Sequence, residues 1–277
     1  MLIWQADFYR RPLQDTTGQP LWELLICDPS RNIEYLAFCP QSNANSTWLT
    51  QQLQQATQTE KPDVIWVFRP QCLSLIQTAA TALGIRVEPN RRTSTLKQWL
   101  QQRSQDYPQL PGYTNEPYKP VELDKPPPVP IPENLWGEVW RFATLPAKDI
   151  VDGFSDRPIP ILEMPDFLYP INLGLPSTVR VPGIVINGGR QSMQLSRWLA
   201  ENQPVSLHYI PGSPDGLILE AGLVDRWVLA TFEDAEVAEA AKMFTERKQL
   251  TKGLHFLLVQ PDDSGMTYTG FWLLRQE

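Results

Sequence analysis

Proline is the most unevenly distributed residue of this chain, and its distribution limits where regular structure can form. Of the 27 prolines, 16 lie between Ser104 and Pro182, whereas 7 precede this stretch and 4 follow it. Proline removes a backbone donor and fixes φ, so residues 111–137 cannot form a helix or an inner strand. We therefore expect three parts: a domain over residues 1–106, a proline-rich arm and irregular connector over 107–181, and a second domain over 182–277.

The arm also carries aromatic and aliphatic side chains, which a freely mobile linker seldom does. They are Tyr113, Tyr118, Val121, Leu135 and Trp136. We therefore expect the arm to pack along a domain surface. The connector that follows it is expected to stay irregular, with short strands at most.

Apolar periodicity predicts a mixed α/β domain before the arm. Alternating runs separated by turn residues predict an antiparallel three-stranded meander over residues 2–11, 21–28 and 33–40. Helical and buried-strand patterns then alternate over residues 46–58, 63–68, 72–84, 85–89 and 93–103, with Asn45 or Ser46 as the first helix cap. The resulting order, βββαβαβα, predicts a five-stranded mixed sheet and matches the ribonuclease-H-like architecture.

The part after Pro182 predicts a second α/β domain. Its first elements are a strand with a glycine turn over residues 183–189, a helix over 192–203 and a strand over 205–210. A hairpin over residues 216–232, a helix over 233–248, and strands over 254–260 and 267–275 follow. The predicted fold class is thus mixed α/β, with two α/β domains joined by a proline-rich arm.

The composition indicates a globular protein without a membrane span. Mean hydropathy is −0.31, and the sequence has no apolar run of about 18 residues. Asp7, Arg10 and Arg11 lie where a secretory signal would need an apolar core. The three cysteines and two histidines are too scattered for a disulfide framework or a zinc site. We therefore expect a reducing, cytoplasmic compartment, no cofactor and no bound metal.

The residues do not predict an enzyme. A ribonuclease-H-like nuclease needs clustered carboxylates that hold divalent metal ions at the strand ends. Asp7 lies on the first strand, but Arg69 follows the buried strand over 63–68 where a carboxylate would be needed. His208 and His255 are expected to be structural, because no nucleophile with a partner is apparent. The glycine turn is expected to be a tight turn, with an anion cradle as the alternative.

Positive charge gathers in one segment of this acidic chain. Between Lys61 and Arg103, seven cations face two acids, so the segment carries +5 in a chain of net charge −7. Such a segment is typical of a surface that binds phosphates, although the same cations could solvate a sheet edge and pair with acids elsewhere. The expected phosphate contacts are Arg69, Arg91, Arg92 and Lys97, with Arg10 and Arg11 extending the surface.

Three stretches carry a resemblance to a known family. They are DFYRRPLQDTTGQPLWELLICD near the start, FRPQCLSLIQTAATALGIRVEPNRRTSTLKQWL in the middle, and FWLLR at the end. Over essentially its whole length the chain resembles the Tab-two/Atab-two family of cyanobacteria and plastids. Its tripeptide Trp272-Leu273-Leu274 matches the WLL tripeptide of that family. Since plastid members carry a transit peptide and this sequence starts directly at the domain, we expect a cyanobacterial form.

The resemblance implies a non-catalytic factor that binds A/U-rich RNA. It also implies a role in the translation of photosystem reaction-centre messages, above all in photosystem I biogenesis. The expected partners are A/U-rich single-stranded RNA and photosystem assembly or translation proteins, without integral membrane association. One alternative is a protein-interaction scaffold, in which the acidic body of the protein and the aromatic, proline-rich arm bind an assembly partner. The other is a metal-dependent nuclease that uses Asp7.

The family tripeptide allows two interpretations. We expect Trp272, Leu273 and Leu274 to lie in a packed strand. If they were exposed, they would instead indicate a docking patch, because contiguous surface hydrophobes mark interaction sites.

Overall fold

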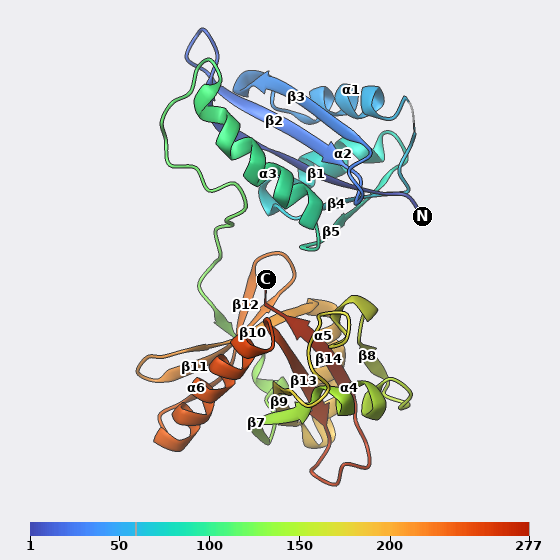
Figure 1. Cartoon of the computed structure of the whole chain (residues 1–277), viewed down its shortest axis with the longest axis vertical. Coiled ribbons are helices and arrows are strands. Elements are labelled where there is room, and N and C mark those ends of the chain that lie inside the picture. Colours follow the sequence, from blue (N-terminus) through green and yellow to red (C-terminus); the bar gives the residue numbers. More distant parts are fainter. Residues whose placement is uncertain (59, 277) are drawn as a thin grey trace. The chain divides into compact units, whose positions relative to one another are not determined.

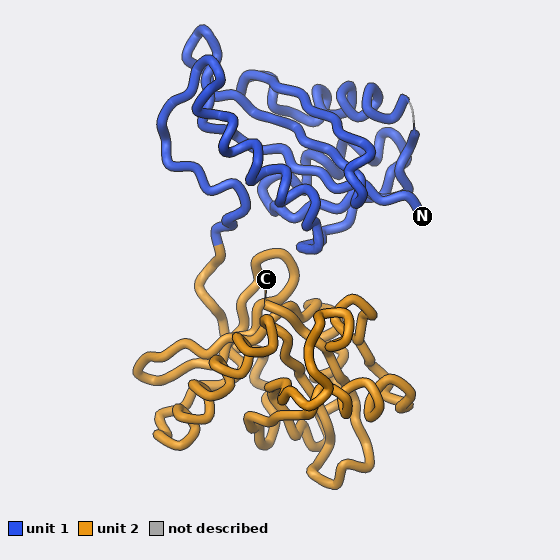
Figure 2. Tube along the Cα trace, in the orientation of Figure 1, with its two compact units in different colours: residues 1–124 blue, residues 125–277 orange. Residues whose placement is uncertain are grey.

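The structure, a computed structural model, describes residues 1–58 and 60–276. It divides into two compact units, residues 1–124 and residues 125–277 (Figure 2). Both units contain strands and helices, which confirms the predicted mixed α/β class. Of the predicted arm and connector, residues 107–124 fall in the first unit and residues 125–181 in the second.

The first unit is built on one five-stranded sheet (Figure 1). Its strands are β1 (Ile3–Gln14), β2 (Pro20–Cys27), β3 (Glu34–Pro40), β4 (Val64–Val67) and β5 (Arg86–Pro89). They lie in the order β3-β2-β1-β4-β5. The pairs β1–β2 and β2–β3 are antiparallel, whereas β4 runs parallel to both β1 and β5. Strands and helices follow one another in the predicted order, and the ribonuclease-H-like assignment stays a prediction.

Three helices cover the two faces of this sheet. They are α1 (Ser46–Ala56), α2 (Pro70–Thr81) and α3 (Ser94–Asp106). Leu49 of α1 and Ile76 of α2 pack with Trp4 of β1. Leu96 of α3 packs with Leu25 of β2 in a separate cluster. Because successive strand side chains point to opposite faces, α1 and α2 cover one face and α3 covers part of the other.

The part of the predicted arm up to residue 124 packs along the first unit, whereas Leu135 and Trp136 belong to the second unit, where Leu135 is buried and Trp136 is exposed. After a short 3-10 turn (Tyr107–Gln109), Gly112 O accepts from Gln14 N at 2.8 Å, and Thr114 N donates to Pro12 O at 3.1 Å. Val121 and Leu123 then pack against the cluster beneath α3. Hydrogen bonds to β1 and apolar contacts therefore hold the arm in place.

The second unit contains two sheets. The four-stranded sheet has the order β10 (Pro204–Ile210), β11 (Asp215–Ala221), β12 (Asp225–Phe232), β6 (Val129–Pro130). The five-stranded sheet has the order β7 (Val139–Pro146), β9 (Arg180–Asn187), β13 (Leu254–Gln260), β14 (Gly270–Arg275), β8 (Ile161–Glu163). Strands β11 and β12 are antiparallel and joined by a short turn, so the predicted hairpin is confirmed.

Three helices accompany these sheets: α4 (Ala147–Phe154), α5 (Ser192–Asn202) and α6 (Ala235–Leu250). The five-stranded sheet is buried on both faces. Ile150 of α4 packs with Phe271 of β14 on one face. Leu195 of α5 and Phe244 of α6 pack with Trp272 of β14 on the other. This double burial explains the continuous apolar runs of its inner strands.

Residues 125–181, which comprise the rest of the predicted arm and the connector, contain more regular structure than the sequence predicts. They supply β6, β7, α4 and β8, together with 3-10 turns at Glu133–Leu135 and Asp166–Leu168. The prolines of this stretch lie at positions where they do not interrupt the hydrogen bonds of a helix. Pro146 ends β7 and precedes α4, so the helix interior contains no proline and keeps its backbone donors.

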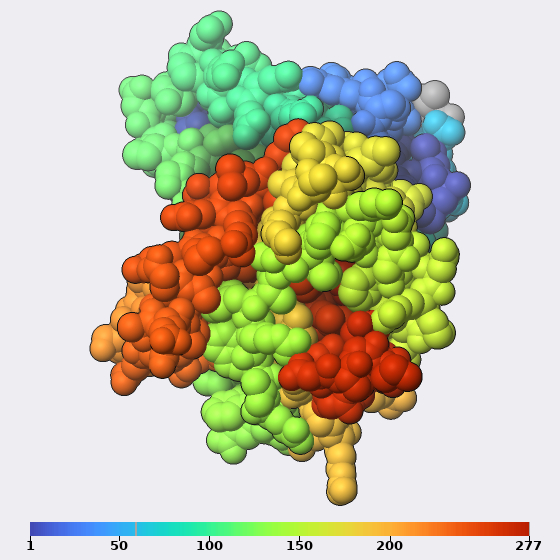
Figure 3. Space-filling model, turned by 60° about the horizontal axis from the view of Figure 1, so that its bottom comes forward, coloured from blue at the N-terminus to red at the C-terminus, as the bar shows by residue number. Residues whose placement is uncertain are grey.

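The loop between β13 and β14 forms a surface projection of the second unit. Figure 3 shows it in red, beside the green residues of β7. Arg141 of β7 and Asp263 of the loop form an ion pair there, with side chains 47% and 63% exposed. This exposed pair contributes about 1 kcal/mol or less to stability.

Candidate functional site

The most concentrated group of charges in the first unit is a buried ionic network on the face of β1 that α3 partly covers. Arg11 Nη2 lies 2.9 Å from Asp7 Oδ2, and Arg69 Nε lies 2.7 Å from Asp7 Oδ1. Arg11 Nε lies 2.8 Å from Glu23 Oε2. Arg69 Nη2 also donates to Pro120 O at 2.7 Å, so the arm takes part in the network.

A third arginine and two tyrosines complete this network. Arg103 of α3 contacts Glu23 Oε1 through Nη2 at 2.7 Å. The hydroxyl of Tyr107 donates to Glu23 Oε2, and the hydroxyl of Tyr118 accepts from Arg11 Nη1 at 2.8 Å. Three guanidinium groups thus face two carboxylates, and every carboxylate oxygen has a donor.

Electrostatics within the network keep its carboxylate on β1 ionised. Burial opposes the ionisation of Asp7, but the guanidinium groups of Arg69 and Arg11 outweigh it, so the pKa of Asp7 lies below its ordinary value. Burial raises the pKa of the Tyr107 and Tyr118 hydroxyls. Both tyrosines therefore stay protonated and act as hydrogen-bond partners of the charged groups.

Two of the residues predicted to contact phosphates, Arg11 and Arg69, belong to this network and must be removed from the predicted surface. They are only 2% and 3% exposed. Their guanidinium groups already bind Asp7, Glu23 and the arm. The sequence shows that these residues are cations, but the charge of a side chain does not reveal whether the folded chain buries it against a carboxylate.

The same network argues against the nuclease alternative. Arg69 and Arg11 bind both oxygens of Asp7, the carboxylate that such an enzyme would offer to a metal ion. Among the described residues, no group of three or more His, Cys, Asp or Glu side chains is placed to hold a metal ion. In this part of the chain, arginines neutralise the carboxylate that a metal ion would neutralise in such an enzyme.

The other predicted cations lie nearer the solvent. Arg91 and Arg92 occupy the loop between β5 and α3, where Arg92 is exposed and Arg91 is half-buried. Lys97, half-buried in the first turns of α3, donates through Nζ to Arg91 O at 2.7 Å. The structure thus brings Arg91, Arg92 and Lys97 together as one group, which we call the loop–α3 cations.

Arg10 pairs with an acid of the arm and not with the loop–α3 cations. It projects from the same strand as Arg11 but on the opposite face, and it is 53% exposed. Its Nη2 lies 3.4 Å from Glu116 Oε2 of the arm. Arg10 is therefore accessible to solvent, whereas its neighbour Arg11 is not.

The tripeptide Trp272-Leu273-Leu274 lies inside the second unit as part of β14. The three residues are at most 3% exposed. Trp272 pairs with Leu257 of β13 and with Glu163 of β8, so the tripeptide has strands on both sides. The tripeptide is a packed strand, and a docking patch at this position is ruled out by burial.

The histidines and cysteines have structural roles in the described chain. His255 is fully buried, and its Nε2 accepts from Leu207 N at 2.9 Å. Ser206 Oγ and Glu220 both approach the same nitrogen of His208, Nε2, so these three residues do not form a catalytic triad. Burial raises the pKa of the three thiols to about 11–12, which keeps them protonated and unreactive.

The glycine turn before α5 is a tight turn. Gly189 has a φ of +52°, a conformation that side chains with a Cβ rarely adopt. A Cβ at Gly189 would clash with the carboxylate of Glu138. A carboxylate at this turn would repel a bound anion, so the geometry opposes the cradle alternative.

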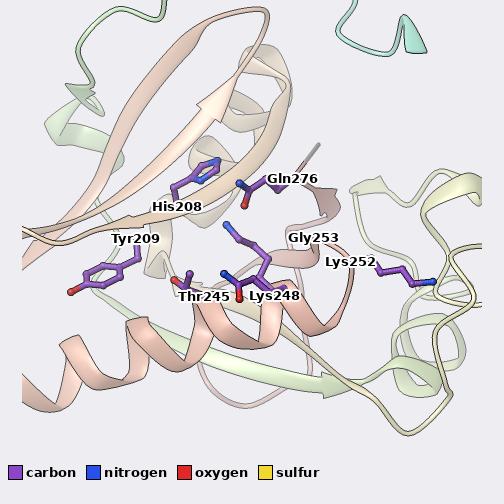
Figure 4. Close-up of a pocket in the computed structure, with 8 residues that line it drawn as sticks. His208, Tyr209, Thr245, Lys248, Lys252, Gly253 and Gln276 are labelled. Carbon is purple, nitrogen blue, oxygen red and sulfur yellow. The ribbon is translucent and has the colours of Figure 1, made fainter. Parts of the chain in front are cut away.

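One feature that sequence reasoning missed is a polar pocket in the second unit around Lys248 (Figure 4). The only signal in the sequence is the density of cations at the end of α6, in Arg247, Lys248 and Lys252. That pattern is also typical of an ordinary helix C-terminus, where cations interact favourably with the helix dipole. The pocket therefore could not be distinguished from a helix end before the fold was known.

Comparison with known proteins assigns both units to one family. Residues 3–103 match the family model described as "RNA-binding protein Tab2/Atab2 N terminal". Residues 118–275 match "RNA-binding protein Tab2/Atab2, C-terminal domain". Among the described residues, none of the helices combines the length and the apolar character that crossing a membrane requires.

Two curated plant proteins are similar over almost the whole chain. "Protein TAB2 homolog, chloroplastic" of Arabidopsis thaliana is 31% identical over 283 residues, covering 98% of this chain and 74% of the relative. The protein of the same name from Zea mays is 30% identical over 288 residues, covering 98% of this chain and 70% of the relative.

Similarity to solved structures is weaker. The catalytic core domain of HTLV-2 integrase in complex with magnesium shares 20% identity over 39% of this chain and 75% of that chain, with a TM-score of 0.27. The corresponding domain of BIV integrase shares 14% identity over 38% of this chain and 65% of that chain, also with a TM-score of 0.27. These scores are too low to carry an argument about fold or catalysis. The matches of the two family models, which follow one another along the chain, show that this protein belongs to the Tab2/Atab2 family of RNA-binding proteins.

Proposed function

We propose that this protein binds A/U-rich single-stranded RNA without catalysis and supports the translation or assembly of photosystem reaction-centre subunits. Membership of an RNA-binding family over both units carries the proposal. The word "chloroplastic" in the names of the plant relatives is consistent with a photosynthetic role. We further propose that the protein acts in the cytoplasm of a cyanobacterial cell, where its three buried thiols would stay reduced.

The loop–α3 cations, extended by Arg10, are the proposed phosphate-binding surface. Lys and Arg that neutralise phosphates release counterions, and this release drives sequence-independent affinity for RNA. Arg92 and Arg10 are exposed, and arginine suits phosphates because its planar group donates several hydrogen bonds in a fixed geometry. Arg11 and Arg69 are not part of this proposal.

The direct test is a fluorescence-anisotropy titration of the full chain with a short A/U-rich single-stranded RNA at two salt concentrations. The same titration with a duplex of equal length and with a G/C-rich single strand tests the preference. We expect salt-weakened binding that favours the A/U-rich single strand. Absence of binding at low salt would overturn the proposal.

Neutralising the loop–α3 cations is expected to weaken RNA binding strongly. The slope of log K against log salt is negative, and each lost phosphate contact reduces its magnitude by about 0.7 for a single strand. Arg91→Gln/Arg92→Gln/Lys97→Gln should therefore reduce the magnitude of the slope by about 2. At about 0.1 M salt this corresponds to roughly 100-fold weaker binding. The measurement is the salt dependence of the anisotropy titration, with thermal unfolding as a check of the fold.

A matched control is Lys119→Gln/Lys148→Gln/Lys242→Gln. These three lysines are 60–75% exposed, and each forms an exposed ion pair with a nearby acid. The control changes the net charge equally but leaves the proposed surface intact. Equal weakening by both triple variants would show that net charge alone governs the affinity and would remove the loop–α3 cations from the proposal.

A protein-interaction scaffold is the second candidate, and one observation favours it. The predicted connector exposes several large apolar side chains: Trp136 is 57% exposed, Phe167 51% and Ile171 79%. Exposed apolar side chains mark protein interaction sites when they gather into a patch. Capture of an assembly partner that survives RNase treatment and is lost in Trp136→Ser/Phe167→Ser/Ile171→Ser would support this role.

The nuclease alternative makes a separate prediction. Because arginines bind the Asp7 carboxylate on both oxygens, we expect that Mg²⁺ neither shifts the thermal unfolding of the protein nor stimulates cleavage of single-stranded RNA. The measurement is a gel assay with Mg²⁺ and with EDTA. Mg²⁺-stimulated cleavage that disappears in a folded Asp7→Asn variant would contradict our assignment.

A further inference from the structure

A pocket of about 440 Å³ opens on the second unit between β10, the last turn of α6 and the segment that follows β14. Figure 4 shows Lys248 rising from α6 between His208 and Gln276, while Lys252 points away from them. This volume lies within the range of pockets that bind small molecules. None of the described residues that line it is an aspartate or a glutamate.

The side chain of Lys248 is the unusual group of this pocket. The residue is 4% exposed, and its Nζ donates to Leu207 O at 2.6 Å. Among the described residues, no carboxylate lies within ion-pair distance of this ammonium group. Glu220 attracts it from farther away but forms its own ion pair with Lys125 at 2.6 Å. Burying a charge without a close counterion is unfavourable, unless a ligand supplies the counterion.

Among the described residues, the other titratable side chains that line the pocket do not cancel this positive charge. Burial, with the nearby charge of Lys248, lowers the pKa of His208 to about 4 and that of His255 to about 3, so both are neutral at pH 7. Burial lowers the pKa of Lys248 itself to about 8, which leaves it mostly protonated at pH 7. The described lining of the pocket therefore carries positive charge in neutral solution.

The helix end beneath the pocket is also compatible with an anion. The carbonyl oxygens of a helix C-terminus normally repel negative charge. Here the carbonyls of Arg247, Lys248 and Gln249 accept from backbone N–H groups of residues 251–253. Gly253, with a φ of +82°, allows the chain to turn back and satisfy them. The carbonyl groups of the last turn of α6 are therefore already hydrogen-bonded, and the group that this turn offers to a ligand is the Lys248 ammonium.

We propose that this pocket binds one phosphoryl group, held by the ammonium of Lys248 and the side-chain amide of Gln276. An ammonium group is a compact donor that suits phosphate oxygens. Lys252 also lines the pocket, although its side chain points away from Lys248. The phosphoryl group belongs either to a free phosphate ester or to an RNA chain. The proposal does not require the RNA-binding role of the loop–α3 cations, because it rests on the second unit alone.

The test titrates inorganic phosphate, UMP and the A/U-rich RNA separately into the full chain at pH 7.5, with calorimetry as the readout. We expect phosphate and UMP to bind. Lys248→Gln should weaken both by more than tenfold, and Gln276→Ala, at an exposed side chain, by about tenfold. Lys242→Gln, on the same helix but ion-paired with Glu239 at 3.4 Å, is the matched control and should change neither.

The pH dependence gives a second readout. Inorganic phosphate is mostly a dianion at pH 7.5 and almost wholly so at pH 9.5, so its own titration cannot weaken binding, whereas Lys248, with a pKa of about 8, loses its charge. The affinity should fall by up to tenfold per pH unit above this value. The histidines are already neutral in this range, and the pKa of Tyr209 is raised, so it stays protonated. Among the described residues, the other charged groups close to His208 and Lys248 are Glu220, Lys125 and Arg226, and Lys252 lines the pocket with its side chain pointing away.

The outcomes separate the two sources of the phosphoryl group. If phosphate and UMP bind through Lys248 and Lys248→Gln also weakens RNA binding, the group belongs to RNA. If RNA affinity is unchanged in that variant, the ligand is a free phosphate ester. Absence of phosphate and UMP binding at millimolar concentration, or binding that Lys248→Gln and Gln276→Ala leave unchanged, would overturn the proposal. RNA binding that depends only on the loop–α3 cations would leave the proposed function intact.

Discussion

Replacement of Asp7 by asparagine is expected to lower the free energy of unfolding by about 3–5 kcal/mol. The substitution keeps the shape of the side chain but removes a charge that Arg11 and Arg69 contact at 2.9 and 2.7 Å. Both guanidinium groups would remain buried with less negative charge to balance them. The measurement is urea unfolding at pH 7, followed by circular dichroism.

The stability difference between the wild-type protein and Asp7→Asn is also expected to depend on pH. The pKa of Asp7 is lower in the folded chain than its ordinary value, so the ionised carboxylate stabilises the fold above the unfolded value of about 3.9. This contribution is lost as the pH falls through the lower, folded value. The difference in stability between the wild-type protein and Asp7→Asn should therefore shrink in acid.

An exposed ion pair provides the control for this prediction. Arg10 and Glu116, 53% and 56% exposed, form a pair at 3.4 Å on the same unit. Glu116→Gln should change the free energy of unfolding by about 1 kcal/mol or less, because water and salt screen such pairs. If Asp7→Asn and Glu116→Gln were equally mild, the network would contribute little to the fold.

The second large effect is expected from Trp272→Ala, which should destabilise the second unit by about 3–5 kcal/mol. Trp272 is fully buried, and its indole ring packs against Gly270 so closely that a Cβ there would lie within 2.5 Å of ring atoms. Its Nε1 has no hydrogen-bond partner among the described residues. Apolar packing therefore holds the ring, and alanine would leave a cavity that the glycine cannot fill.

Trp136→Ala is the matched control for this prediction, because Trp136 is 57% exposed. Its removal should change stability by about 0.5 kcal/mol. Thermal unfolding of both variants, followed by circular dichroism, is the measurement. A Trp272→Ala protein of unchanged stability would contradict the packed-strand assignment.

The sequence predicted the elements of the first unit because local signals there agree with the tertiary structure. Asn45 was an expected helix cap, and its side chain accepts from Trp48 N at 3.0 Å. Gly84, expected to end the second helix, has a φ of +65°. Each signal depends on a few neighbouring residues, so no knowledge of distant contacts is needed to read it.

The connector was harder to predict because its average composition hides its regular elements. The apolar run of β7 and the helix α4 stand between prolines, and the composition of the whole stretch favours an irregular chain. β8 has only three residues (Ile161–Glu163) and is stabilised by β14, which is distant in sequence. Such a strand forms because it pairs with its partner strand, so the local sequence contains little that predicts it.

The candidate site was predicted only in part for a related reason. Arg69 and Arg92 look alike in the sequence, but one is 3% exposed and contacts Asp7, whereas the other is exposed. Asp7 and Arg69 are distant in the chain and meet because β1 and β4 are neighbours in the sheet. Long-range pairing of this kind appears only when the fold is known.

The position of β14 also has a consequence for how the protein is made. Every element of the first unit lies within residues 1–124, so this unit can fold while the ribosome is still extending the chain. In the second unit, β8 has to wait for β14, which is the last of the described strands along the chain and inserts between β8 and β13. A ribosome that stalls before residue 270 would therefore hold a finished first unit beside a second unit with exposed strand edges, the kind of nascent chain that chaperones recognise.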